Sequence, residues 1–205
     1  MAELFLELQK SINRKIMSSD RPVSIAYWGG PGTGKSSYAR GFYNYYRTEY
    51  PGKVTKFVRE YPTDWLNNNS LEDWHFQKHV QEHFIEQQSI REIAALESDV
   101  LVTECPVPLC CFWAKLHGDS DENIAKYDSY ARTWFPSYNI NVLMASPNTY
   151  FPFERLDIRP TYPMAKAAHS DIIDYFFKIG GSTFLAVYTE DIDAVNQEIM
   201  KLIEG

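Results

Sequence analysis

The fold is decided by the stretch Val23-Ser24-Ile25-Ala26-Tyr27-Trp28-Gly29-Gly30-Pro31-Gly32-Thr33-Gly34-Lys35-Ser36. Its first six residues form an apolar run typical of a buried strand, and a glycine-rich loop and a helical pattern follow directly. The loop fits the pattern G-x-x-x-x-G-K-[ST], with Gly29, Gly34, Lys35 and Ser36 at the fixed positions. Because a chance glycine turn would rarely stand between a strand and a helix, this context indicates a phosphate-binding loop.

Each part of the loop has a physical role in holding a triphosphate. The glycines let successive backbone N–H groups turn inward and form an anion-binding concavity, which a Cβ would crowd. The helix that begins near Lys35 points the positive end of its dipole at the same place. We expect Lys35 to reach the β- and γ-phosphates and the Ser36 hydroxyl to hold Mg²⁺. The residues expected to bind ATP and Mg²⁺ are Gly30, Pro31, Gly32, Thr33, Gly34, Lys35, Ser36 and Ser37.

The composition is that of a soluble globular protein. The chain has 205 residues, of which 44% are hydrophobic, 23% charged and 15% aromatic, and we interpret the aromatic excess as packing. A net charge of -7 argues against a general nucleic-acid coat but leaves a local basic groove open. The three cysteines, Cys105, Cys110 and Cys111, fit no zinc or disulfide pattern. The sequence has neither a signal-peptide pattern nor an apolar run of membrane-spanning length, so we expect a cytoplasmic protein without a membrane partner. In that reducing compartment we expect the cysteines to be buried thiols.

Strand and helix patterns alternate along the whole chain. Strands are predicted at 23–28, 54–58, 99–104, 140–144 and 183–187, and helices at 2–18, 35–48, 71–97, 107–117, 121–134, 163–178 and 191–204. Ser70 and Asp191 are the expected N-caps of the helices that follow them. The alternation predicts an α/β fold, a three-layer sandwich with helices on both faces of a parallel five-stranded sheet, as one domain over residues 1–205.

Two carboxylates flank the third predicted strand, and the direction of the strand separates their roles. Ligands of a parallel sheet lie at the carboxyl ends of its strands. Asp99 lies at the amino end and is expected to cap a turn. Glu104 lies at the carboxyl end, in the Walker B position, where it can orient the Mg²⁺ shell or accept a proton from an acceptor hydroxyl. The alternative is a structural carboxylate.

Acidic and aromatic residues also follow the second predicted strand. Glu60, Tyr61 and Asp64 lie at the same edge of the sheet, where a small acceptor would bind, with Tyr61 and Trp65 as stacking surfaces. A solvated loop explains these residues equally well.

The segment 146–163 has four prolines and no clean periodicity, which is typical of a functional loop. It contains Arg155 and Arg159, whose spacing places both on one face of a helical turn, and we interpret the segment as a lid that clamps phosphates. The alternative is a pair of surface salt bridges. His75, His79 and His83 are spaced for one helix face, and we prefer a polar face to a metal site because no H-E-x-x-H pattern accompanies them.

Four segments resemble the small P-loop kinases related to the nicotinamide riboside kinase module of the bacterial NAD regulator, a group that many phage-encoded kinase-like ATPases resemble. The segments are residues 28–37, residues 57–61, the helix around Gln87-Gln88 and residues 100–106, and the likeness runs from about 23 to 188. It implies phosphate and Mg²⁺ binding by Lys35 and Ser36, an acceptor near Glu60 and a catalytic carboxylate at Glu104. It also implies that Arg155 and Arg159 belong to a lid and act in catalysis.

The sequence departs from this family at the end of the third strand, which reads Glu104-Cys105-Pro106 where the family usually has Asp. No arginine follows directly, and this argues against an ordinary deoxynucleoside as substrate. The expected function is transfer of the γ-phosphoryl group of ATP to a nucleoside, a nucleotide or a related hydroxyl acceptor. Two alternatives stay open: a kinase for hydroxymethyluracil in phage DNA, and a nucleotide-binding switch or assembly ATPase without a small acceptor.

Overall fold

The computed structural model describes residues 21–69, 80–116, 120–144, 162–188 and 191–205. The predicted helix over 2–18, the expected N-cap Ser70 and nearly all of the segment 146–163 lie outside these residues.

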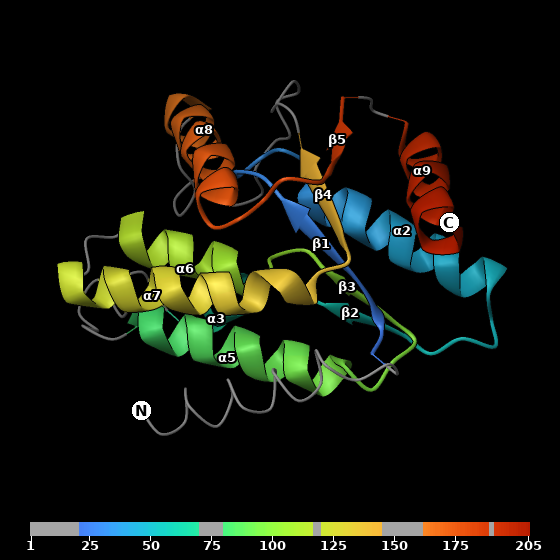
Figure 1. The fold of residues 1–205 in the computed structure, drawn as a ribbon, viewed down its shortest axis with the longest axis horizontal. Coiled ribbons are helices and arrows are strands. Elements are labelled where there is room, and N and C mark those ends of the chain that lie inside the picture. The colour runs from blue at the N-terminus through green and yellow to red at the C-terminus, as the bar shows by residue number, and fades with distance from the viewer. Residues whose placement is uncertain (1–20, 70–79, 117–119, 145–161, 189–190) are drawn as a thin grey trace.

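Five parallel strands form one sheet in the order β2-β3-β1-β4-β5, which confirms the predicted sheet (Figure 1). The strands are β1 (Val23–Trp28), β2 (Thr55–Val58), β3 (Val100–Thr103), β4 (Ile140–Met144) and β5 (Leu185–Val187). The central strand β1 pairs with β3 on one side and β4 on the other, so the strand order reverses there. Ligands bind at such a reversal in open α/β sheets, and here the glycine-rich loop leaves the sheet at this point.

Helices cover both faces of the sheet, as predicted (Figure 1). α2 (Lys35–Glu49) and α9 (Ile192–Glu204) lie on one face, and α5 (Val80–Ala95), α6 (Val107–Leu116), α7 (Asp121–Trp134) and α8 (Tyr162–Lys178) lie on the other. A 3-10 turn, η1 (Phe135–Ser137), leads into β4, and α3 (Tyr61–Asn68) follows β2. The expected cap of the last helix is confirmed, because the Asp191 side chain accepts hydrogen bonds from the backbone N–H groups of Asp193 and Ala194.

The helix α3 is an element that the sequence patterns did not predict. Its first turn contains Pro62, which reads as a loop residue because proline breaks the interior of a helix. In the first turn, however, the missing N–H of proline has no intrahelical partner to lose. The polar and aromatic segment after β2 is therefore a helix that begins directly after Glu60.

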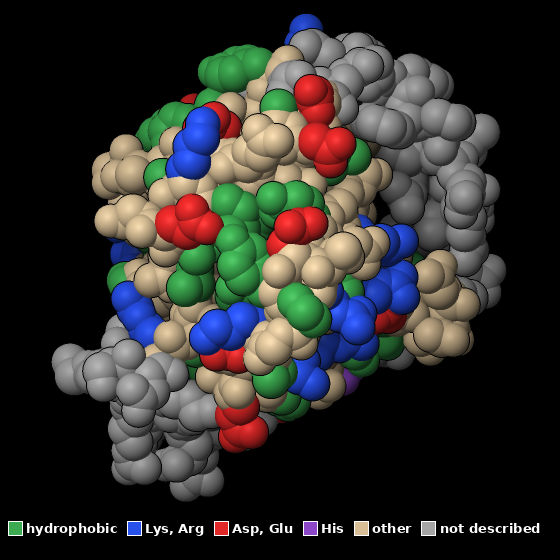
Figure 2. Space-filling view, turned by 90° about the vertical axis from the view of Figure 1, so that its right-hand side faces the viewer, with side chains coloured by type: hydrophobic (Ala, Val, Ile, Leu, Met, Phe, Trp, Pro, Cys, Tyr) green, Lys and Arg blue, Asp and Glu red, His purple; other side chains and the backbone are tan. Residues whose placement is uncertain are grey.

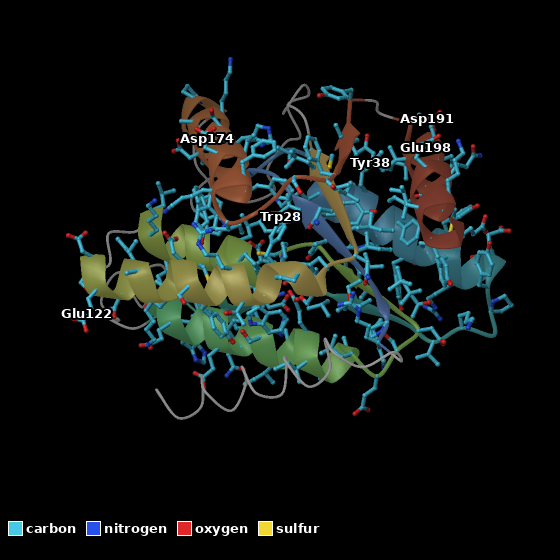
Figure 3. All side chains as sticks on the ribbon, viewed as in Figure 1. Trp28, Tyr38, Glu122, Asp174, Asp191 and Glu198 are labelled. Atoms are coloured by element: carbon cyan, nitrogen blue, oxygen red, sulfur yellow. The ribbon has the colours of Figure 1, made fainter. Side chains whose placement is uncertain are left out.

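Alternation along β1 divides the core between the two helical layers. Ile25 and Tyr27 pack in the cluster that contains α2 and α9, whereas Ala26 and Trp28 pack in the cluster of α5 to α8. Trp28, the last residue of β1, is fully buried against the helices α5 to α8. Its Nε1 donates to Asn141 Oδ1 at 2.9 Å (Figure 3). The three cysteines are buried free thiols in the described structure. Among the described residues, none of the helices is long and apolar enough to cross a bilayer.

The face on the side of α9 carries both signs of charge, with Lys and Arg side chains gathered in one part of it (Figure 2). Two arginines of α2 lie over aromatic rings: the Arg40 guanidinium is 6.0 Å from the ring centre of Phe57, and that of Arg47 is 5.2 Å from the ring centre of Tyr43. These cations thus pack on the outer surface of α2 and β2, and the local basic groove stays a prediction.

Asp99 has a capping role, as its position at the amino end of the strand predicted, and the residue that it caps lies directly before β2. Its Oδ2 accepts a hydrogen bond from the Val54 backbone N–H at 2.7 Å, and Lys53 Nζ lies 3.3 Å from its Oδ1. The bond from Val54 and the ammonium of Lys53 together lower the pKa of Asp99 below its ordinary value.

This arrangement predicts a pH-dependent loss of stability in Asp99→Asn. The folded state lowers the pKa of Asp99, so the carboxylate contributes stability above its unfolded pKa of about 4, and that contribution is lost as the pH falls through the folded pKa. Chemical denaturation should therefore give a lower free energy of unfolding for the variant at pH 7, with a difference from wild type that shrinks below about pH 4. An unchanged difference between pH 7 and pH 3 would contradict the assignment.

Candidate functional site: the phosphate loop and the neighbouring strand ends

The glycine-rich loop holds a backbone geometry that side chains would disturb. Gly34, at the N-cap of α2, has a φ of 85°, a left-handed conformation that favours glycine. At Gly30 the reason is space, because a Cβ there would lie 2.8 Å from Cβ and 2.9 Å from Cα of His169 on α8. The glycines thus permit both the tight turn and the close approach of α8 to the loop.

Hydrogen bonds within the loop converge on the carbonyl of Gly30. It accepts from Thr33 Oγ1 at 2.8 Å and from Lys35 Nζ at 3.0 Å, so the ammonium lies over the loop. Ser36 and Ser37 lie in the first turn of α2, and Ser36 is exposed. The positive end of α2, the Lys35 ammonium and the exposed residue Ser36 therefore all belong to the loop and the first turn after it, and phosphate and Mg²⁺ binding there stays a prediction.

Glu104 follows β3 and lies beside the end of β2. It is 6% exposed, and its Oε1 accepts a hydrogen bond from the Glu60 backbone N–H at 3.2 Å. Its Oε2 is also buried and has no hydrogen-bond partner in the part of the chain that the structure describes. A buried carboxylate oxygen without a donor is costly unless a ligand completes its contacts, so Glu104 differs from a satisfied structural carboxylate.

The acceptor edge expected after β2 is built by α3 and α5. The Glu60 Oε2 accepts from Thr63 Oγ1 at 2.6 Å, which fixes this carboxylate at the start of α3. The ring of Tyr61 lies under the guanidinium of Arg91, 4.7 Å from its centre, and its hydroxyl contacts His83 Nε2 at 2.9 Å.

Asp64 is paired with two arginines: Arg91 Nη1 lies 2.7 Å from its Oδ2, and Arg59 Nη2 lies 3.4 Å from its Oδ1. Tyr61 and Asp64 therefore have protein partners at this edge, and Glu60 is the acidic residue that also contacts Glu104. The role of Arg91 was missed because two of its partners, Tyr61 and Asp64, lie on α3, which no sequence pattern indicated.

Charges from the glycine-rich loop and from the segment after β2 both act on Cys105. The contact with Cys110 and burial raise the pKa of the Cys105 thiol well above its ordinary value. Glu60 raises this pKa further, whereas Lys35 lowers it. Both charges thus lie close enough to act on Cys105, the residue directly after Glu104. Lys35 follows the carboxyl end of β1, Glu60 follows that of β2 and Glu104 follows that of β3, and these three adjacent parallel strands end at one edge of the sheet. Of the three residues, Glu60 and Glu104 are joined by a hydrogen bond.

A contact between the loop and α8 was not foreseen from the sequence. The Gly30 backbone N–H donates to His169 Nδ1 at 3.1 Å, which requires this ring nitrogen to be unprotonated. No sequence pattern marks this contact, because the two residues are 139 positions apart.

Four of the predicted or considered site residues, Arg155, Arg159, His75 and His79, lie outside the described residues. His83 contacts Tyr61, and in the described segments no three His, Cys, Asp or Glu side chains gather as a metal site.

Comparison with known proteins supports the fold. No family model matches the sequence, and no curated protein does either. Among solved structures, the chain is similar to the crystal structure of the NadR protein in complex with NR, with a TM-score of 0.64 and 13% sequence identity. The match covers 86% of this chain and 51% of that one, so this chain spans about half the length of the protein that it matches. At this identity the likeness shows a shared fold, and it agrees with the parallel α/β sheet described above.

Proposed function

We propose that the protein is an ATP- and Mg²⁺-dependent kinase that transfers the γ-phosphoryl group to a hydroxyl acceptor, a nucleoside, a nucleotide or a related compound. The observation that carries the proposal is the position of Glu104, which has a buried Oε2 without a donor and touches the acidic acceptor edge through its other oxygen. A site built for nucleotide binding alone has no need of a second carboxylate at Glu60, on the side away from the central strand.

The residues present fit both ATP and Mg²⁺. The glycine cradle and the ammonium of Lys35 suit the phosphates, since backbone N–H groups and a cation are the contacts that bind them in such loops. The exposed hydroxyl of Ser36 is an oxygen donor of the kind that Mg²⁺ prefers, and the Glu104 carboxylate can orient the water shell of the ion. When bound, the ion would neutralise part of the negative charge that develops on the phosphates.

The chain's own residues then have separate roles. Lys35 and the loop N–H groups hold the triphosphate and stabilise negative charge in the transition state. Glu60 binds the acceptor next to Glu104, and the Glu104 Oε2 takes the proton of the attacking hydroxyl. The bond between the γ-phosphorus and the bridging oxygen of ADP breaks as the acceptor oxygen bonds to phosphorus. Arg155 and Arg159 lie outside the described residues, and their proposed role is to bind the phosphates through their charge.

One experiment tests the proposal and sorts the acceptors. The protein is incubated with γ-labelled ATP and Mg²⁺ and offered nucleosides, nucleotides or duplex DNA containing hydroxymethyluracil. We expect the label on a small acceptor, at a rate that changes little with salt. Label on the modified DNA, with an affinity that falls steeply with salt, would instead establish the DNA-base kinase. Label only in free phosphate, whatever the acceptor, would rule out both and leave the switch or assembly ATPase.

A further inference from the structure

A single buried glutamine bridges the two chain segments that carry Glu60 and Glu104. Gln88, on α5, is 0% exposed. Its Oε1 accepts a hydrogen bond from the Tyr61 backbone N–H at 2.9 Å, and its Nε2 donates to the Cys105 carbonyl at 2.8 Å. Tyr61 directly follows Glu60 in the sequence, and Cys105 directly follows Glu104. One amide group therefore contacts the backbone immediately beyond both carboxylates.

The position of β2 explains why such a bridge matters. β2 is the edge strand of the sheet, and its register with β3 ends at the pair Val58 and Thr103. Beyond that pair, one backbone bond, from the Glu104 N–H to the Val58 carbonyl at 3.3 Å, continues the ladder. The bond from the Glu60 N–H to Glu104 Oε1 forms only if the segments after β2 and β3 are held at the right distance from each other. The Gln88 amide contacts both segments and so restrains the distance between them.

The orientation of the Gln88 amide is fixed by its neighbours. The Nε2 lies near two acceptors, the Cys105 carbonyl and, at 3.4 Å, the Glu92 Oε1, whereas the other end lies near a donor, the Tyr61 N–H. An amide flipped by 180° would place its NH₂ against the Tyr61 N–H and its carbonyl against two acceptors. The surroundings therefore admit one orientation only.

Glu92 in turn is held by a buried network one turn along α5. It is 0% exposed, and its Oε1 also accepts from Thr103 Oγ1 at 3.1 Å. Its Oε2 accepts a hydrogen bond from the Tyr138 hydroxyl at 2.8 Å. The same hydroxyl accepts a hydrogen bond from the Val107 backbone N–H at 3.1 Å. Burial raises the pKa of Glu92 to about 7, although the bonds from Tyr138, Gln88 and Thr103 oppose the rise. A buried ionisable group of this kind is expensive, so a core with no other task would have an apolar residue here.

We propose that Gln88 is a positioning residue, which sets the separation of Glu60 and Glu104 and thereby the geometry of phosphoryl transfer. This inference rests on the proposed function, because the expected change in kcat can be measured only if the protein transfers phosphate. The hydrogen bonds of the Gln88 side chain go to Tyr61, Glu92 and Cys105 and not to the phosphate loop, so the effect falls on kcat rather than on ATP binding.

The first test compares two buried glutamines of the same helix. Gln88→Met keeps the length of the side chain and removes its three hydrogen bonds. Gln81→Met makes the same change at a residue that is 9% exposed and lies about two turns earlier on α5. We expect kcat to fall at least about tenfold in the first variant, with KM for ATP within about twofold, because small errors in alignment cost large factors in rate. The Gln81 variant should keep both constants.

The second test uses Gln88→Glu and keeps the proposal testable if the methionine variant does not fold. When ionised, the introduced carboxylate still accepts from the Tyr61 N–H but repels the Cys105 carbonyl and Glu92, whereas the protonated carboxyl group donates as glutamine does. We therefore expect kcat of this variant, relative to wild type, to rise as the pH falls from about 8 to about 6, the range in which a buried carboxyl group can titrate. The titratable groups around this position are Glu60, Tyr61, His83, Glu92, Glu104, Cys105, Cys110 and Tyr138.

The outcomes separate the inference from the proposed function. If the wild type transfers phosphate and Gln88→Met keeps its kcat, or if Gln88→Glu shows the pH profile of wild type, Gln88 is only structural and the inference is wrong. If the wild type transfers phosphate to none of the acceptors, the proposed function fails and the inference falls with it.

Discussion

Lys35→Ala is expected to lower phosphoryl transfer by at least about 10²- to 10³-fold, because a preorganised charge at the developing phosphate charge typically contributes that much to catalysis. The ammonium of Lys35 lies over the loop and bonds the Gly30 carbonyl at 3.0 Å. No neighbouring cation on the loop can replace it, since Pro31, Gly32, Thr33 and Gly34 carry no charge. Initial rates of label transfer at saturating ATP measure the loss.

The matched control is Lys201→Ala, which removes the same charge from the exposed end of α9. Lys201 is paired with Glu198 on the same helix and its side chain is 69% exposed, so its loss should change neither transfer nor stability by a measurable amount. Thermal unfolding should show that both variants keep the fold. If Lys35→Ala transferred phosphate at the wild-type rate, the loop would have no part in catalysis.

Glu104→Gln is expected to lower kcat by about 10²- to 10⁴-fold, the usual contribution of a positioned general base, with a change of less than about threefold in KM for ATP. Glutamine keeps the shape of the side chain and an oxygen that can accept from the Glu60 N–H, so the geometry of the edge is preserved. It loses the ability to take a proton. Steady-state rates over a range of ATP and Mg²⁺ concentrations measure both constants.

Glu122→Gln provides the charge control for this variant. Glu122 is exposed in the first turn of α7, at the end of the helix far from the strands (Figure 3). Its replacement should leave kcat unchanged. Equal losses of kcat and of ATP affinity in Glu104→Gln would make Glu104 structural. Recovery of the lost rate at high Mg²⁺ would assign it to the metal rather than to the proton.

The parts of the structure that follow from local sequence were predictable. The strand, loop and helix around Lys35 are fixed by a contiguous motif, and the position of Glu104 follows from the rule that parallel strands present their carboxyl ends at one edge. The same rule distinguishes Asp99 from Glu104, although the two residues flank the same short strand. In each case the deciding information lies within a few residues of the side chain.

The parts that depend on distant side chains were not predictable. The contact of Gln88 with Tyr61 spans 27 positions, and that of Gly30 with His169 spans 139. Gln88 shares a helix face with Phe84 and Ile85, but the sequence does not show which backbone groups its amide would contact. The start of α3 was missed for a local reason, because a proline in a polar segment indicates a loop until the helix around it is known.

The most direct test of phosphoryl transfer is a single labelled turnover in the presence of a mixed pool of nucleosides and nucleotides, with protein in excess over γ-labelled ATP. We predict that the label appears on an acceptor as ATP disappears, in equal amounts, and that Lys35→Ala shows neither change. Label that appears only in inorganic phosphate, at the same rate with and without the pool, would contradict the central claim that this loop and its neighbouring carboxylates form a site for phosphoryl transfer.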